Sequence, residues 1–80
     1  MIRLTLFHTS HCHLCEQAEA LLVTCLDPAR VDVWATDIAD QDALVTRYGT
    51  RIPVLRRDAD GLELDWPFDA ASLQRFVDAP

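Results

Sequence analysis

The sequence from Ile2 to Cys15 reads IRLTLFHTSHCHLC and specifies the first two elements of the fold. Apolar and polar residues alternate over residues 2–8, which predicts a β-strand because successive side chains of a strand point to opposite faces. Cys12 and Cys15 follow directly. The hydroxyl groups of Thr9-Ser10 are typical of residues that cap a helix. We therefore predict a strand that leads into a helix with a Cys-x-x-Cys pair in its first turn.

Apolar residues after Cys12 recur at helical spacing, and Pro28 ends the helix that they predict. The stripe consists of Leu14, Ala18, Leu21, Leu22 and Cys25. Because free cysteine commonly packs as a small apolar side chain, we expect Cys25 to lie in the core.

The rest of the chain predicts a strand, a short helix, a hairpin and a last helix. The strands are expected at 31–36, 52–55 and 62–64, with a turn at 58–61; Asp40 caps the short helix and Gly49 ends it, and Asp69 caps the last helix, whose apolar face is Leu73, Phe76 and Val77. A strand-helix-strand unit requires a parallel pair, whereas a hairpin is antiparallel. We therefore expect one α/β domain over residues 1–80, with a four-stranded mixed sheet and three helices in the order β-α-β-α-β-β-α.

Composition narrows the class of function. The 80 residues include thirteen acidic and seven basic side chains, none of them lysine, and the formal net charge is −6. Nucleic acid is disfavoured as a partner because phosphate binding depends on clustered Lys and Arg. No apolar run approaches the roughly 18 residues of a membrane span, and the first residues lack a secretory signal pattern. We therefore expect a cytoplasmic monomer that binds no membrane.

The Cys-x-x-Cys pair is the feature that carries chemistry. In a reducing cytosol such a pair is typically redox-active or metal-binding. The N-terminus of a helix stabilises negative charge and lowers the pKa of a cysteine thiol there. We predict that Cys12, nearer the exposed end, is the nucleophile and Cys15 the resolving thiol. His11 and His13 flank Cys12, and a protonated imidazole would stabilise its thiolate further.

Other uses of the same residues remain open. Zinc could bind Cys12, Cys15 and two of the nearby histidines, or Cys12 could ligate an iron–sulfur cluster shared by two chains. A binding module without redox activity is a third alternative. A c-type haem is excluded because Glu16 stands where the Cys-x-x-Cys-His motif needs histidine. Our preferred interpretation has no metal site and no tightly bound cofactor.

A strand ending in a Cys-x-x-Cys helix, followed later by Ile52-Pro53-Val54, resembles the thioredoxin superfamily, and the short form resembles glutaredoxins. More narrowly, RYGTRIPVL at 47–55 and DWPFD at 65–69 resemble the bacterial glutaredoxin-like family. The resemblance implies a thioredoxin/glutaredoxin-like fold and a thiol–disulfide oxidoreductase. It further implies a disulfide-bearing protein or a glutathione mixed disulfide as partner, with either glutathione as a co-substrate or a flavin-dependent reductase regenerating the dithiol.

The resemblance also implies a substrate groove. Pro53 would be cis and lie beside the cysteine pair, and the backbone of Ile52 would pair with the substrate or glutathione. Thr50 and Arg51 would complete the groove. Glutaredoxins usually have Cys-Pro-Tyr-Cys preceded by a basic residue, and a Gly-Gly turn before the last helix. This chain has neither, so Arg51 is the remaining partner for a glutathione carboxylate. We expect Trp66 and Phe68 to pack on the core; an exposed rim for a protein substrate is the alternative.

Overall fold

The computed structural model describes residues 1–80, which form four strands, three α-helices and one short 3₁₀ helix. They are β1 (Ile2–His8), α1 (His13–Cys25), β2 (Val31–Asp37), η1 (Ile38–Asp40), α2 (Asp42–Tyr48), β3 (Val54–Arg57), β4 (Glu63–Asp65) and α3 (Ala70–Asp78). The predicted element order is confirmed. None of the helices is long and apolar enough to cross a bilayer.

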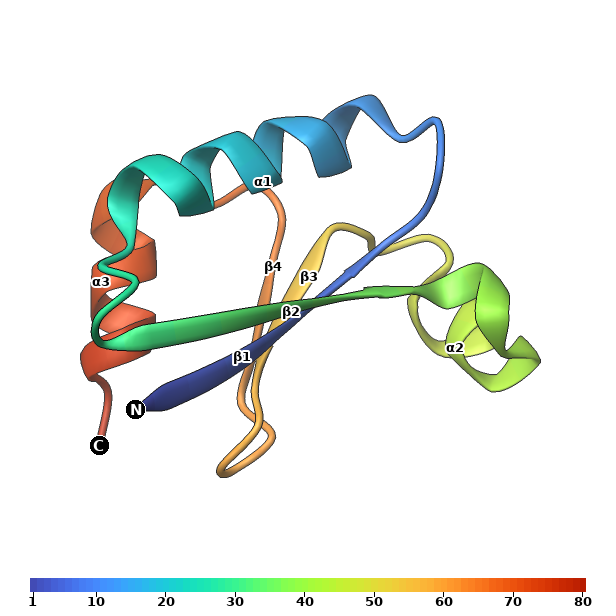
Figure 1. The fold of residues 1–80 in the computed structure, drawn as a ribbon. Coiled ribbons are helices and arrows are strands. Elements are labelled where there is room, and N and C mark those ends of the chain that lie inside the picture. The colour runs from blue at the N-terminus through green and yellow to red at the C-terminus, as the bar shows by residue number, and fades with distance from the viewer.

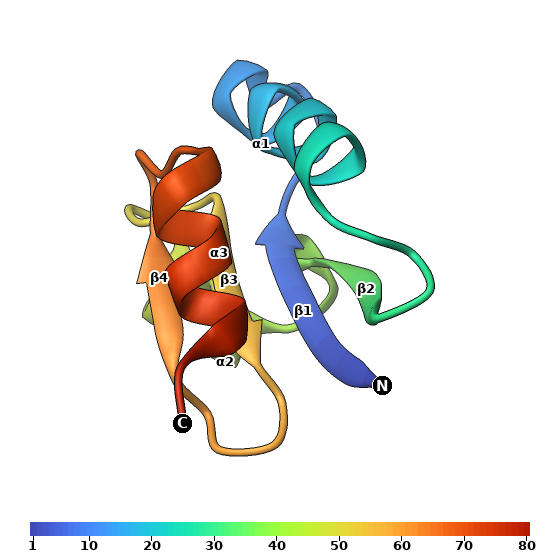
Figure 2. The same ribbon diagram turned by 90° about the vertical axis from the view of Figure 1, so that its left-hand side faces the viewer.

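The sheet has the strand order β2-β1-β3-β4, with β1 and β2 parallel and the other two pairs antiparallel. Helices α1 and α3 lie over one face of the sheet, and α2 lies beyond the end of β2 (Figures 1 and 2). The predicted four-stranded mixed sheet with three helices is therefore confirmed.

Two apolar clusters hold these layers together. The larger one fills the space between the sheet, α1 and α3, and its buried members are Leu4, Leu6, Ala18, Leu22, Val31, Leu55, Phe68, Leu73, Phe76 and Val77. The smaller one comprises Phe7, Ile38, Tyr48 and Val54. Because β1 contributes to both clusters, its side chains are buried on either face of the sheet, as befits a central strand.

The helix ends agree only in part with the sequence-based expectations. Asp69 caps α3 with a reciprocal capping box to Ser72, as predicted. Gly49 ends α2 as predicted, although its φ of −54° is right-handed. The prediction that Asp40 caps the short helix is wrong, because the turn η1 intervenes: Asp37 caps η1 by accepting from the Ala39 N–H at 3.0 Å, and α2 begins after Gln41 without a side-chain cap.

Strand β3 starts later and extends further than the predicted 52–55. Proline has no N–H to donate to a ladder, and the strand begins just after Pro53. At its other end Arg57 pairs with Leu4 and is buried, because its guanidinium donates to the carbonyls of Phe76 and Ala79. The prediction from apolar residues placed the end of this strand too early because its last buried position is occupied by an arginine.

Candidate active site

The two cysteines lie at the junction between β1 and α1. Cys12 and Cys15 form a disulfide, with their Cα atoms 5.2 Å apart. Cys15 lies in the first turn of α1 and is only 2% exposed, whereas Cys12 is partly exposed. A partner can therefore reach the sulfur of Cys12 more easily than that of Cys15.

Cys12 itself is the N-cap of α1. Its Sγ accepts a hydrogen bond from the Cys15 N–H at 3.2 Å, and its carbonyl accepts from the Glu16 N–H at 3.1 Å. The expectation that Thr9 or Ser10 caps this helix is therefore wrong, because the sulfur occupies the capping position. An unpaired N–H at a helix start favours negative charge, so in the reduced protein the same amide would stabilise the Cys12 thiolate.

The buried face at the start of α1 differs from the predicted apolar stripe. Leu14, predicted to face the core, is 44% exposed, and Cys15 is buried instead. Further along the helix Cys25 is half-buried against the larger apolar cluster, which agrees with the packing role predicted for it.

The two flanking histidines are both exposed. His11 has a φ of +56°, in the left-handed region that non-glycine residues adopt rarely and that is often found near functional sites. His13 Nδ1 lies 3.9 Å from Glu16 Oε2, so a protonated His13 would share its charge with that carboxylate. Tuning of Cys12 by these histidines stays a prediction.

Asp37 is a neighbour of the site that the sequence reasoning missed. It ends β2 and pairs in register with His8, the last residue of β1. Hydrogen bonds from the Ala39 N–H and from Thr9 lower the pKa of Asp37 below its usual range. An Asp two residues before a turn N–H is the local signal that could have indicated this cap.

The loop before β3 reaches the same end of the sheet. Phe7 pairs with Val54 in the antiparallel register of β1 and β3, so the start of β3 lies beside the end of β1, from which the chain continues to Cys12. The Ile52–Pro53 bond is cis, as the resemblance implies, and so is Trp66–Pro67, which was not foreseen. Pro53 is buried, and its carbonyl accepts from the Trp66 N–H at 3.2 Å.

Arg51 connects this loop to β4 through hydrogen bonds. Its guanidinium donates to Glu63 at 2.8 Å and to both carboxylate oxygens of Asp65 at 2.8 and 3.0 Å. These hydrogen bonds raise the pKa of Arg51 and lower that of Asp65. Burial alone would raise the pKa of Glu63, but hydrogen bonds from Tyr48 and Arg51 outweigh it and lower the pKa. A ligand carboxylate would therefore have to compete for Arg51 with two carboxylates of the same chain.

The other residues of the expected groove differ in exposure. Thr50 is exposed, and Ile52 is half-buried against the smaller apolar cluster. Phe68 is 6% exposed, and Trp66 packs edge-on against it with ring centroids 5.0 Å apart. The packing interpretation of these two aromatic residues is therefore confirmed. Nowhere do three or more His, Cys, Asp or Glu side chains gather as a group that could hold a metal ion.

Residues 3–78 match the family described as Glutaredoxin-like domain (DUF836). The chain belongs to the glutaredoxin-like family. This glutaredoxin-like protein is similar to the X. campestris protein XcR50. The chain in the X-ray structure of XcR50 is 43% identical in sequence, with a TM-score of 0.84 over 96% of this chain and 97% of that one. The solution structure of XcR50 is 44% identical, with a TM-score of 0.81 over 100% and 96% of the two chains.

Protein Ne2328 from Nitrosomonas europaea has the same fold, with a TM-score of 0.80 and 23% identity over 96% of this glutaredoxin-like chain and 92% of its own. No protein with a curated description matches in sequence. The comparisons thus establish the family and the fold, and the cysteine pair at disulfide distance supports redox chemistry of the thioredoxin type.

Proposed function

We propose that this glutaredoxin-like protein is a thiol–disulfide oxidoreductase, with Cys12 as the nucleophile and Cys15 as the resolving thiol. The observation that carries the proposal is the unequal placement of the two sulfurs. Cys12 is partly exposed, and its Sγ accepts the Cys15 N–H at the helix start, whereas Cys15 is 2% exposed behind it. The accessible sulfur is thus the one whose thiolate the helix stabilises.

The reaction follows from this arrangement. In the reduced protein the Cys12 thiolate attacks one sulfur of a partner disulfide, forming a mixed disulfide and releasing the other partner sulfur as a thiolate. Cys15 then loses its proton to solvent and attacks the Cys12 sulfur. The second partner sulfur leaves as a thiolate, and the Cys12–Cys15 disulfide forms. Two electrons have passed to the partner, and external thiols must reduce the Cys12–Cys15 disulfide before the next cycle.

The substrate would be a disulfide-bearing protein or a glutathione mixed disulfide, with glutathione or a flavin-dependent reductase as the electron donor. Thr50, Ile52 and Pro53 would form one wall of the substrate groove, beside Cys12 at the same end of the sheet. Arg51 would hold that wall in place through its ion pairs with Glu63 and Asp65. In this role Arg51 is a positioning residue.

Reduction of a mixed disulfide between glutathione and a small thiol, driven by glutathione, tests the proposal. Cys12→Ser should abolish turnover. Cys15→Ser should still form a mixed disulfide with the substrate, detectable by mass spectrometry. Cys25→Ser is the matched control, because it removes a thiol on the same helix outside the pair, and it should keep full activity. Unchanged turnover in Cys12→Ser would refute the proposed nucleophile.

If glutathione drives no turnover, the same variants are assayed with dithiothreitol and an oxidised protein substrate. Turnover that depends on Cys12 in this second assay would retain the oxidoreductase and exclude glutathione as its donor. Absence of Cys12-dependent turnover with both donors would contradict the proposed function.

A further inference from the structure

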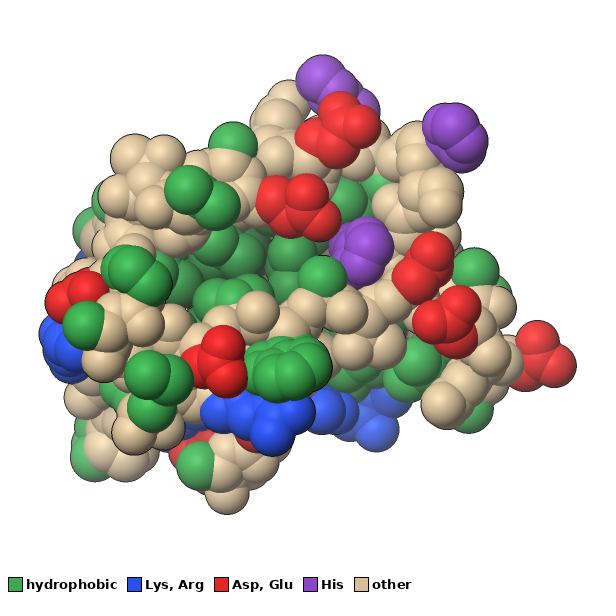
Figure 3. All heavy atoms as spheres, in the orientation of Figure 1, with side chains coloured by type: hydrophobic (Ala, Val, Ile, Leu, Met, Phe, Trp, Pro, Cys, Tyr) green, Lys and Arg blue, Asp and Glu red, His purple; other side chains and the backbone are tan.

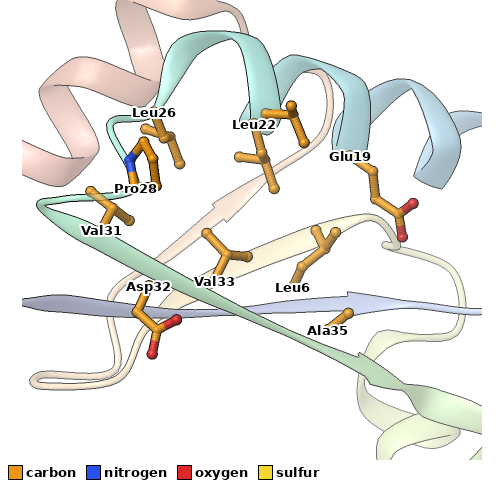
Figure 4. A pocket seen from close by; sticks show the side chains of 10 residues that line it. Leu6, Glu19, Leu22, Leu26, Pro28, Val31, Asp32, Val33 and Ala35 are labelled. Carbon is orange, nitrogen blue, oxygen red and sulfur yellow. The ribbon is translucent and has the colours of Figure 1, made fainter.

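An apolar groove runs between α1 and β2, apart from both cysteines. It has a volume of about 510 Å³, and seven of its ten lining residues are hydrophobic. Leu22 of α1 and Leu26, which directly follows the helix, point toward the sheet, and Val33 and Leu6 point back at them (Figure 4). In the space-filling view apolar side chains fill a hollow on this face, with carboxylates along its border (Figure 3).

One wall of the groove is an open sheet edge. β2 is the outermost strand in the order β2-β1-β3-β4, so only one of its sides is paired. A free edge offers a row of backbone donors and acceptors to an added strand. The edge continues the groove outward, since Val31, Val33 and Ala35 line it from β2. An extended segment could therefore pair with β2 and place alternate side chains in the groove.

The net charge of the molecule lies in the segment of the chain that includes α1 and β2. Between Leu4 and Thr46 the chain has seven carboxylates and a single arginine, whereas the remaining residues hold six carboxylates and six arginines. The single arginine, Arg30, is paired with Asp78 of α3 at 3.3 Å. The entire formal charge of −6 therefore belongs to residues 4–46, which form most of β1, α1, β2, η1 and the start of α2.

Two of these carboxylates border the groove itself. Glu19 projects from α1 at one end, and Asp32 lies on β2 with its side chain directed away from α1 (Figure 4). Neither forms an ion pair with an arginine, although Asp32 accepts a hydrogen bond from Trp34 Nε1 at 2.7 Å and Arg3 lies over the Trp34 ring. A strand added at the edge would thus find apolar contacts on the side of α1 and negative charge along the border.

We propose that this groove and the free edge of β2 bind an extended segment of a partner protein in which apolar residues alternate with Lys or Arg. The apolar side chains enter the groove, the alternate basic ones lie on the opposite face beside Asp32, and a basic residue at the end of the segment lies beside Glu19. A second copy of this chain is a poorer occupant, because β2 would bring two strongly acidic surfaces together. Binding requires no electron transfer, so the proposal can stand or fall independently of the oxidoreductase.

The test uses two synthetic peptides with alternating valine, one carrying lysine and the other glutamate at the remaining positions. Titration of the oxidised, isotope-labelled protein is followed by amide chemical shifts and by calorimetry at low and high salt. The lysine peptide should shift amides of β2 and α1, and its affinity should fall as salt rises. The glutamate peptide should not bind.

Matched variants locate the site. Glu19→Gln with Asp32→Asn should weaken binding about five- to tenfold, as expected for two partly exposed charge pairs. Asp40→Asn with Asp42→Asn changes the net charge equally but lies outside the groove, and should have little effect. Val23→Ser, on the groove side of α1, should weaken binding about threefold or more, whereas Val45→Ser on α2 should not.

Any one of three results with the peptides would overturn the proposal: equal binding of both peptides, equal effects of the two charge variants, or shifts confined to residues outside α1 and β2. A stable dimer of the free protein by sedimentation, with its contact at β2, would assign the edge to a second copy and also overturn it. Cys12-dependent turnover is measured separately, so loss of peptide binding leaves the proposed reaction untouched.

Discussion

Replacing Arg51 with methionine should destabilise the fold, because this side chain joins the loop before β3 to β4. A hydrogen bond to a charged group contributes about 1.5–3 kcal/mol when buried, and an exposed ion pair contributes about 0.2–1 kcal/mol. The Glu63 side chain is 17% exposed and approaches the first case, whereas Asp65 at 48% approaches the second. We therefore expect a loss of about 2 kcal/mol near pH 7.

Such a loss corresponds to a melting temperature roughly 10 °C lower for a domain of this size. Arg47→Met is the matched control. Both Arg51 and Arg47 lie over the Tyr48 ring, but the guanidinium of Arg47 is 3.8 Å from Glu63 and its side chain is 67% exposed. We expect this control to change stability by less than about 0.5 kcal/mol.

The difference between Arg51→Met and the native protein should depend on pH. The pKa values of Glu63 and Asp65 are lowered in the folded state, so their stabilisation is present above the ordinary carboxyl pKa and is lost as the pH falls through the lowered values. Urea unfolding between pH 7 and pH 3 should therefore show the difference shrinking toward acid. A difference that is independent of pH, or equal losses in both arginine variants, would show that the Arg51 ion pairs are not the source of this stability.

Three further predictions concern backbone geometry and are checked by thermal unfolding. Asp69→Ala removes one half of the α3 capping box and should lower the melting temperature by about 5 °C. Asp69→Asn keeps a side-chain acceptor and should retain most of the native stability. Equal losses in the two variants would contradict a capping role. His11→Gly should raise stability by a few tenths of a kcal/mol and His11→Val should lower it by about 1 kcal/mol, because φ is positive there; the opposite order would exclude this origin. Gly49→Ala should be destabilising, since an added Cβ would lie 2.5 Å from the Val45 carbonyl oxygen; an unchanged melting temperature would show that α2 shifts freely to accommodate it.

Local patterns were sufficient for much of the fold. Alternation over residues 2–8 corresponds to β1, and the cap at Asp69 with Leu73, Phe76 and Val77 corresponds to α3. The position of the Cys-x-x-Cys pair at a strand-to-helix junction was likewise readable. These features depend on neighbours a few residues away, so the sequence contains all the information that they need.

Features that depend on distant partners were not readable from the chain alone. Arg57 extends β3 because carbonyls of α3 receive its guanidinium, and Arg51 is engaged because β4 brings two carboxylates to it. Cys12 caps its own helix because the turn through His11 directs its sulfur at the Cys15 amide. The α1–β2 groove likewise exists only once the strands have taken their order. Periodicity records which face of an element is apolar, whereas packing alone determines what meets that face, and this is why the elements followed from the sequence and their partners from the tertiary structure.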